Sequence, residues 1–141
     1  MIQAEGQFHK CNESLYQGKE TILFVDDEVY LAEVGREMLE DYGYVVDTMT
    51  SPSQALERFE RDQDRYDLLI TDYTMPKMTG DQLVERIHGL RPGLPVIMCT
   101  GTELPLEISQ RIIVAKTLLK PFDMDELLKV VRQVLDSSTQ G

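Results

Sequence analysis

The chain has 141 residues, which is enough for one domain with its own core and too short for two ordinary domains. Hydrophobic residues make up 42% and charged residues 28% of the sequence, a balance typical of globular rather than disordered chains. Asp and Glu outnumber Lys and Arg by 25 to 14, for a formal net charge of -11, which argues against direct binding of nucleic acid because phosphate binding needs a basic surface. The same excess suits a site for a divalent cation, or serves only solubility.

The two cysteines, Cys11 and Cys99, predict neither a disulfide nor a zinc site. Cys11 falls in a polar segment near the start and Cys99 in an apolar run, and neither is spaced with a histidine as zinc ligands are. No apolar run reaches the roughly 18 residues that a membrane helix needs, and residues 1–10 lack the apolar core of a secretory signal. We therefore expect a cytoplasmic protein without membrane insertion.

Five short apolar runs predict β-strands that alternate with helices. Residues 1–19 are polar and without a period, and we interpret them as a tail or a linker. The first run, 21–25, is nearly all apolar, as a strand covered on both faces must be, and the others fall at 44–48, 68–72, 95–99 and 117–119. Apolar residues at helical spacing follow each run, at 31–40, 55–59, 83–90, 106–113 and 127–135. The fourth helix is the hardest to place, because Pro105 can occupy only a first helical turn.

Three of the helices are preceded by a capping-box pattern, in which a Ser, Thr or Asp caps the helix and a Glu or Gln three residues later returns a hydrogen bond. The pairs are Ser51 with Gln54, Thr79 with Gln82, and Asp123 with Glu126. Pro52 adds a proline at the first helical position of the second helix.

The alternation of strand and helix predicts an α/β fold, with a five-stranded parallel sheet, helices on both faces and right-handed crossovers. The doubly wound strand order 2-1-3-4-5 is the natural choice. We expect one domain over residues 20–136, a short C-terminal tail at 137–141, and no second domain after the last helix.

Polar residues stand at the ends of four of these strands. Asp26 and Asp27 follow the first, Asp72 ends the third, Thr100 follows the fourth and Lys120 the fifth. Because open α/β sheets bind ligands at the carboxyl ends of their strands, we expect these side chains to share one site. Two carboxylates about 5 Å apart repel by roughly 3 kcal/mol at an effective dielectric near 20, so such a cluster needs a cation or a proton.

The chain resembles the response regulator receiver domain of two-component signalling, a flavodoxin-like fold, over roughly residues 20–136. The resemblance rests on four motifs in order: Val25-Asp26-Asp27, Asp72 with Met75-Pro76 and Gly80, Thr100-Gly101, and Lys120-Pro121-Phe122. An Asp-Asp pair alone would say little, but all four motifs fall at the ends of the predicted strands.

The resemblance implies a Mg²⁺ site. Asp26 and Asp27 would bind the ion together with Asp72, Asp27 directly and Asp26 through a water. Thr74 would add its backbone carbonyl. Mg²⁺ is small and hard, prefers oxygen ligands and usually keeps several waters.

The resemblance also implies phosphoryl chemistry. Asp72 would be the phosphoacceptor, since a carboxylate can attack phosphorus and form an acyl phosphate. Lys120, before a cis bond to Pro121, would place its charge on the phosphoryl group and pair with Asp72 when metal is absent. Thr100 would donate its hydroxyl to a phosphoryl oxygen and shift inward on phosphorylation, with Gly101 leaving room for that group.

Two features depart from the family pattern. Receiver domains often carry an aromatic residue three positions before the lysine, and here that position holds Thr117. The region of the fourth helix is short and lacks the Gly-Ala step that often precedes the fifth strand. The family's use of the face formed by helix four, strand five and helix five is therefore not carried over, whereas every residue of the phosphorylation chemistry is present.

The sequence favours a phosphoacceptor switch that takes a phosphoryl group from the phosphohistidine of a sensor kinase, either alone or as part of a hybrid kinase. It would catalyse its own phosphorylation and dephosphorylation and signal through protein contact or through a histidine phosphotransfer protein. A phosphorylation-independent docking module is one alternative, against which the complete acidic set argues. An aspartate-dependent phosphatase of the haloacid dehalogenase type is another, but that class needs an Asp-x-Asp and the segment 26–28 lacks the second Asp.

Overall fold

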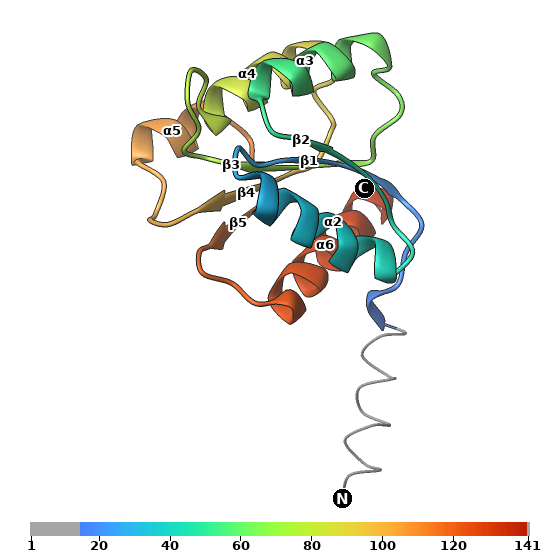
Figure 1. The fold of residues 1–141 in the computed structure, drawn as a ribbon. Coiled ribbons are helices and arrows are strands. Elements are labelled where there is room, and N and C mark those ends of the chain that lie inside the picture. The colour runs from blue at the N-terminus through green and yellow to red at the C-terminus, as the bar shows by residue number, and fades with distance from the viewer. Residues whose placement is uncertain (1–14, 141) are drawn as a thin grey trace, which may run out of the picture.

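The structure, a computed structural model, describes residues 15–140 and contains the predicted five-stranded parallel sheet (Figure 1). Its strand order is β2-β1-β3-β4-β5, which confirms the predicted order 2-1-3-4-5. The strands are β1 Thr21–Val25, β2 Val45–Met49, β3 Leu68–Asp72, β4 Val96–Thr100 and β5 Lys116–Leu119.

Five helices connect and follow the strands in the described part of the chain: α2 Val29–Asp41, α3 Pro52–Arg61, α4 Gly80–Leu90, α5 Leu106–Arg111 and α6 Met124–Gln140. Helices α2 and α6 cover one face of the sheet and α3 and α4 the other (Figure 1). Helix α5 is short, as its sequence predicted. Helix α6 continues to Gln140, so the expected boundary at residue 136 falls inside a helix and residues 137–140 are not a separate tail.

The centre of the sheet is buried on both faces because alternate residues of β1, β3 and β4 enter different cores. In β1, Ile22 and Phe24 pack with α2 and α6, whereas Leu23 and Val25 pack with α3 and α4. All four side chains are buried. A central strand of this kind must be almost wholly apolar, which is why its first polar residue falls at the edge of the sheet.

The side chains of the predicted capping boxes take part in helix starts. The Asp123 carboxylate accepts a hydrogen bond from the Glu126 N–H (2.8 Å), and the Glu126 carboxylate accepts one from the Asp123 N–H (3.3 Å). The Ser51 hydroxyl accepts a hydrogen bond from the backbone N–H at the third helical position of α3 (3.4 Å). Such caps satisfy backbone donors that a helix leaves open at its start.

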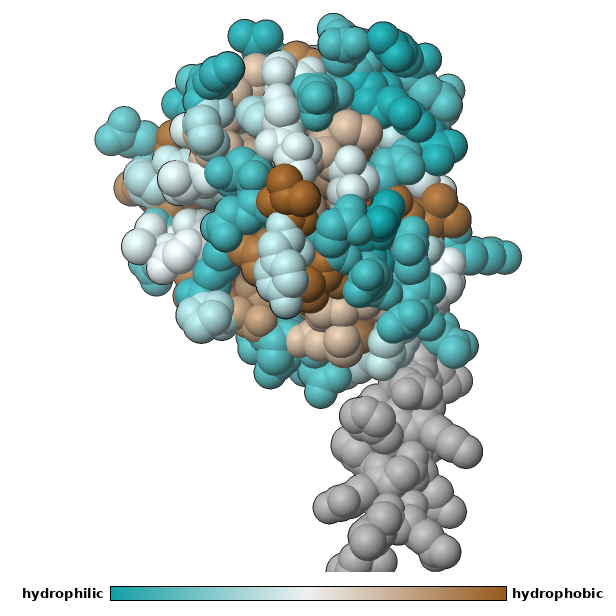
Figure 2. Space-filling view, in the orientation of Figure 1, coloured by the Kyte–Doolittle hydropathy of each residue, from teal (hydrophilic) through white to brown (hydrophobic). Residues whose placement is uncertain are grey.

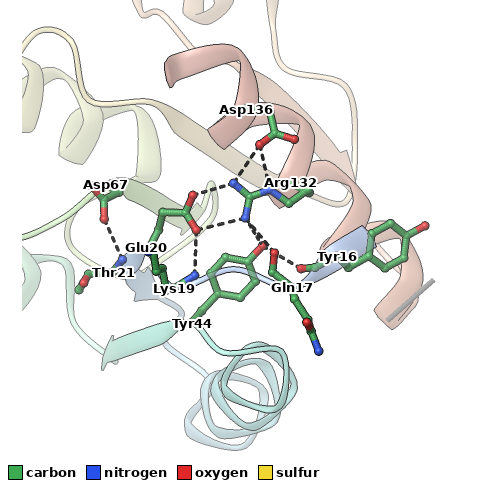
Figure 3. A network of polar contacts seen from close by, with 9 residues as sticks. All are labelled: Tyr16, Gln17, Lys19, Glu20, Thr21, Tyr44, Asp67, Arg132 and Asp136. Carbon is green, nitrogen blue, oxygen red and sulfur yellow. Dashed lines mark hydrogen bonds and ion pairs between the residues drawn. The ribbon is translucent and has the colours of Figure 1, made fainter. Parts of the chain in front are cut away.

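Residues 16–19, which we expected to belong to a tail, are held against the domain (Figure 3). Arg132 of α6 donates to the Gln17 carbonyl (3.2 Å) and forms an ion pair with Glu20 at 2.6 Å. The Gly18 N–H donates to the Tyr42 carbonyl (3.0 Å). These contacts join residues 16–19 to the rest of the domain. Cys11 and the rest of the predicted tail, 1–14, lie outside the described residues.

Over residues 15–140, none of the helices combines the length and the apolar character that crossing a membrane requires. Cys99 is buried in β4 as a free thiol, and burial raises its pKa to about 12.

Candidate functional site

Parallel strand register brings the predicted site residues to one edge of the sheet. Val25 of β1 is paired with Thr71 of β3, so the residues that follow them, Asp26 and Asp72, lie next to one another. On the far side of β3, Thr100 of β4 is paired with Leu119 of β5, which puts Lys120 just beyond the same edge.

Three carboxylates form an acidic cluster at this edge. Asp26, Asp27 and Asp72 each offer an oxygen atom, and these oxygens all lie within 4.8 Å of one another. Asp26 and Asp72 are only 5% and 6% exposed, whereas Asp27 is half-buried. One oxygen of Asp26 also accepts the Glu28 N–H (2.9 Å), which fixes this side chain in the β1–α2 loop. Carboxylates of this kind are hard oxygen donors, suited to a small divalent cation.

Lys120 is the cation of this cluster. Its Nζ lies 2.5 Å from Asp72 Oδ1 and 4.0 Å from Asp26 Oδ2. Its backbone N–H donates to the Thr100 carbonyl (2.8 Å), and its peptide bond to Pro121 is cis, as predicted. The predicted pairing of Lys120 with Asp72 is therefore present in the structure.

Its environment makes Asp72 a weaker acid than an exposed aspartate. Burial raises the pKa of Asp72 to about 6, the hydrogen bond from Lys120 opposes that rise, and the charges of Asp26 and Asp27 add to it. Burial alone would lower the pKa of Lys120, but its bond to Asp72 raises it. Three ionised carboxylates and one ammonium leave the site at a formal charge of 3 × (-1) + 1 = -2.

Thr100 lies at the same edge of the sheet, but its hydroxyl does not donate its hydrogen bond to Asp72. The side chain is buried, and its hydroxyl donates to the Thr102 carbonyl (2.8 Å). Thr74 is exposed at the start of the β3–α4 loop, and its carbonyl remains a predicted metal ligand. A side chain at Gly101 would point into open space, so protein atoms do not require a glycine there.

Gly80 has a structural role that the sequence did not reveal. A Cβ at this position would clash with the Asp72 carbonyl oxygen and would lie 2.8 Å from Met98 Sδ and 2.9 Å from Tyr73 Cα. The Gly80 N–H donates to the Tyr73 carbonyl at 2.7 Å. The first residue of α4 thus lies directly against the backbone of Asp72. Its place in the motif was the only sequence signal for it.

Two depressions reach the cluster from opposite sides. One, of about 380 Å³, is lined by Asp27, by residues of the β2–α3 turn and by 76–78. The other, of about 330 Å³, is more apolar and lies between α2 and the start of α6, with Asp26 and Lys120 at one end. Figure 2 shows apolar surface among hydrophilic side chains in the region of α2, on the face turned to the viewer. Each depression is thus lined by an acidic residue of the cluster, Asp27 in the first and Asp26 in the second.

Comparison with known proteins gives a consistent result. A family model described as the response regulator receiver domain matches residues 22–132. Response regulator RppA of Synechocystis sp. is 33% identical over 121 residues, which are 84% of this chain and 52% of RppA. A 14.6 kDa protein in the sodA1 3′ region of Leptolyngbya boryana is 35% identical over 116 residues, which are 79% of this chain and 87% of that protein.

The fold has solved counterparts as well. A CheY-like response regulator receiver domain protein from Methanospirillum hungatei superposes with a TM-score of 0.79 at 29% identity, over 87% of this chain and 98% of that one. This chain spans about half the length of RppA and smaller shares of several other curated relatives. Since the family model covers well over half of the sequence, the chain belongs to the response regulator receiver domain family of two-component systems.

Proposed function

We propose that this chain is a phosphoacceptor switch that takes a phosphoryl group onto Asp72. The observation that carries the proposal is the gathering of three carboxylates within 4.8 Å, with Lys120 bonded to one of them, at the ligand-binding edge of the sheet. A buried aspartate with a purely structural role would need only a cation such as Lys120 and no further carboxylates beside it. A charge of -2 around a carboxylate at the sheet edge is an arrangement that a cation and a phosphoryl group together would complete.

The residues present fit a Mg²⁺ ion. Asp27 and Asp72 would hold it directly, Asp26 through a water and Thr74 through its carbonyl, so all the donors are hard oxygens. When bound, the ion supplies charge neutralisation for the phosphoryl oxygens, which is most of what phosphoryl transfer needs from a protein.

The chain's own residues have distinct tasks. An Asp72 oxygen attacks phosphorus, an O–P bond forms, and the P–N bond of a donor phosphohistidine breaks, with the leaving nitrogen taking the electron pair and a proton. Lys120 exchanges its partner from Asp72 Oδ1 to a phosphoryl oxygen. Thr100 must release the Thr102 carbonyl before its hydroxyl can donate to the phosphoryl group, because the hydroxyl has a single proton. Attack of water on phosphorus later breaks the bond to the Asp72 oxygen, releases inorganic phosphate and restores the carboxylate.

The donor that fits is a sensor histidine kinase or a histidine phosphotransfer protein in the cytoplasm. The apolar groove between α2 and α6 ends at Asp26 and Lys120, so a protein seated there would present a histidine next to Asp72. The protein would act on itself only and pass its signal on through protein contact or onward phosphotransfer.

Incubation of the protein with acetyl phosphate and Mg²⁺, followed by intact mass spectrometry, tests the proposal. The wild-type protein and Asp64→Asn, which changes an exposed aspartate in the α3–β3 loop, should each gain one phosphoryl group. Asp72→Asn should gain none, and Asp27→Asn should gain it more slowly. Labelling of Asp72→Asn would refute Asp72 as the acceptor. A wild-type protein that does not react would indicate a docking module, and turnover of many phosphoesters would indicate a phosphatase.

A further inference from the structure

Helix α5 has little packing to hold it in place. It has six residues, of which none is buried, and no side chain caps its start. Leu106 at its beginning is 71% exposed. Its apolar contacts with the core come from the partly buried Ile108 and from Ile112, the residue just after the helix. A helix of this length is not stable on its own, so its position depends on the contacts that its ends make.

The last residue of α5, Arg111, makes the strongest of these contacts. Its Nη2 lies 2.5 Å from Asp81 Oδ2 and its Nε lies 2.6 Å from Glu85 Oε1, both on α4. Asp81 is only 4% exposed, and within residues 15–140 Arg111 is its ion-pair partner. A buried carboxylate that loses its partner carries an uncompensated charge, so this contact is costly to break. We use "α4–α5 clamp" for Arg111 with Asp81 and Glu85.

The clamp begins next to the phosphoacceptor. Asp81 follows Gly80, which lies against the carbonyl of Asp72 and donates to the Tyr73 carbonyl at 2.7 Å. Because no space separates Gly80 from this backbone, the start of α4 and the loop after Asp72 form one rigid unit.

The other side of the clamp leads to Thr100. Only residues 101–105 separate Thr100 from α5, and the Thr100 hydroxyl is bonded inside that loop to the Thr102 carbonyl. The loop is thus fixed at Thr100 by the β4–β5 ladder and at its far end by Arg111. The structure contains a closed path of contacts from Asp72 through Gly80, the clamp and the β4–α5 loop back to Thr100.

We infer that Arg111 is a positioning residue for phosphorylation, which ties the loop that carries Thr100 to the helix that lies against Asp72. The inference rests on the proposed function. Without the fork to Asp81 and Glu85, the α5 end of the β4–α5 loop loses its polar anchor and is held by apolar packing alone. The loop from which the Thr100 hydroxyl must turn to the phosphoryl group is then no longer set relative to Asp72, although the acidic cluster and Lys120 are unchanged.

The test measures labelling of the full chain by acetyl phosphate with Mg²⁺ over a range of acetyl phosphate concentrations. Arg111→Gln should lower the maximal rate by roughly 10-fold to 100-fold, since a misplacement of reacting groups by about 1 Å can cost about 100-fold. The half-saturating concentration should stay unchanged, because the groups that bind the donor remain. Arg111→Lys, which keeps the charge without the fork, should recover part of the rate. The matched control is Arg61→Gln, which removes an exposed arginine paired with Glu57.

Hydrogen exchange of the unphosphorylated protein gives a second readout. Amides of residues 101–111 should exchange faster in Arg111→Gln than in the wild-type protein, whereas amides of the β1 and β3 ladders should not. Asp81→Asn added to Arg111→Gln should change the labelling rate less than it does alone, as expected for two partners in one contact. If Arg111→Gln does not fold, Arg111→Lys carries the same comparison.

The two hypotheses fail in different ways. A wild-type protein that is never labelled would overturn the proposed function, and this inference with it. A wild-type protein that is labelled, together with an Arg111→Gln protein labelled at the same maximal rate, would overturn the inference alone. A change in the half-saturating concentration without a change in the maximal rate would also overturn it, because it would assign Arg111 to donor binding.

Discussion

Replacing Asp72 by Asn tests the electrostatics of the site without any phosphoryl donor. The pKa of Asp72 is raised to about 6 in the fold, mainly by burial, against about 4 in an unfolded chain. The folded protein therefore holds this proton more tightly than the unfolded chain does. Stability linked to Asp72 is then fully present below about pH 4 and is lost as the pH rises through about 6. A difference of about 2 pKa units corresponds to a loss of about 3 kcal/mol by pH 8.

Asn resembles the protonated acid, so Asp72→Asn should not suffer this loss. We expect urea unfolding in EDTA to show the variant as more stable than the wild-type protein by about 1 to 3 kcal/mol at pH 8, the lower value allowing for relaxation of the site. The difference should be smallest at pH 4 and level off above about pH 7. Titrating groups that do not interact with Asp72 contribute equally to both proteins, so their contributions cancel in the difference.

The competing outcome has a clear physical meaning. Lys120 lies 2.5 Å from Asp72, and an ion pair that outweighed the burial of Asp72 would make the wild-type protein the more stable one at pH 8. A destabilised Asp72→Asn protein, or a difference that does not vary with pH, would refute the reasoning from burial and carboxylate repulsion. Asp64→Asn, which changes an exposed acid, is the control and should show no such trend.

Three further measurements test other parts of the structure. Millimolar Mg²⁺ should raise the melting temperature at pH 7.5 and much less at pH 5, where Asp72 is protonated. A Mg²⁺ concentration 100-fold above Kd would stabilise the folded protein by about 2.7 kcal/mol. No shift in melting temperature would count against the metal site. Gly80→Ala should destabilise the protein by about 1 to 3 kcal/mol in urea through its clash with the Asp72 backbone, whereas Gly89→Ala on the same helix, in open space, should be neutral or stabilising. Arg132→Gln should lower stability by about 1 to 3 kcal/mol and speed amide exchange at residues 17–19, because the partly buried Arg132 loses Glu20; unchanged exchange there would show that this segment is held by other contacts.

The fold could be predicted because the three central strands, β1, β3 and β4, are buried on both faces and each runs into or ends in a polar residue. The predicted strands 44–48 and 95–99 lie one residue earlier than β2 and β4. At β2 the cause is visible, since the Tyr44 N–H donates to the Leu39 carbonyl (3.3 Å) and so closes α2 instead of joining the sheet. Local sequence patterns were enough to predict the strands and helices, whereas a single backbone hydrogen bond decided where β2 begins.

The sequence predicted those site residues that stand at the ends of strands, and no others. Asp26, Asp72 and Lys120 come together because parallel register follows from the strands themselves. The contact between Arg111 and Asp81 joins residues 30 positions apart, and the one between Arg132 and Glu20 joins residues 112 positions apart. Neither pair has a periodic or motif signal, because each depends on how two helices or a loop pack in three dimensions.

The charges at the site also relate metal binding to phosphorylation. With all groups ionised, the three carboxylates and Lys120 sum to -2. A phosphoryl group carries up to about -2 and replaces the single charge of Asp72, so phosphorylation alone would bring the sum to about -3. A divalent cation returns it to about -1. The repulsion that raises the pKa of Asp72 would thus grow on phosphorylation in the absence of metal, and we expect the cation to be required for formation of the acyl phosphate and not only to accelerate it.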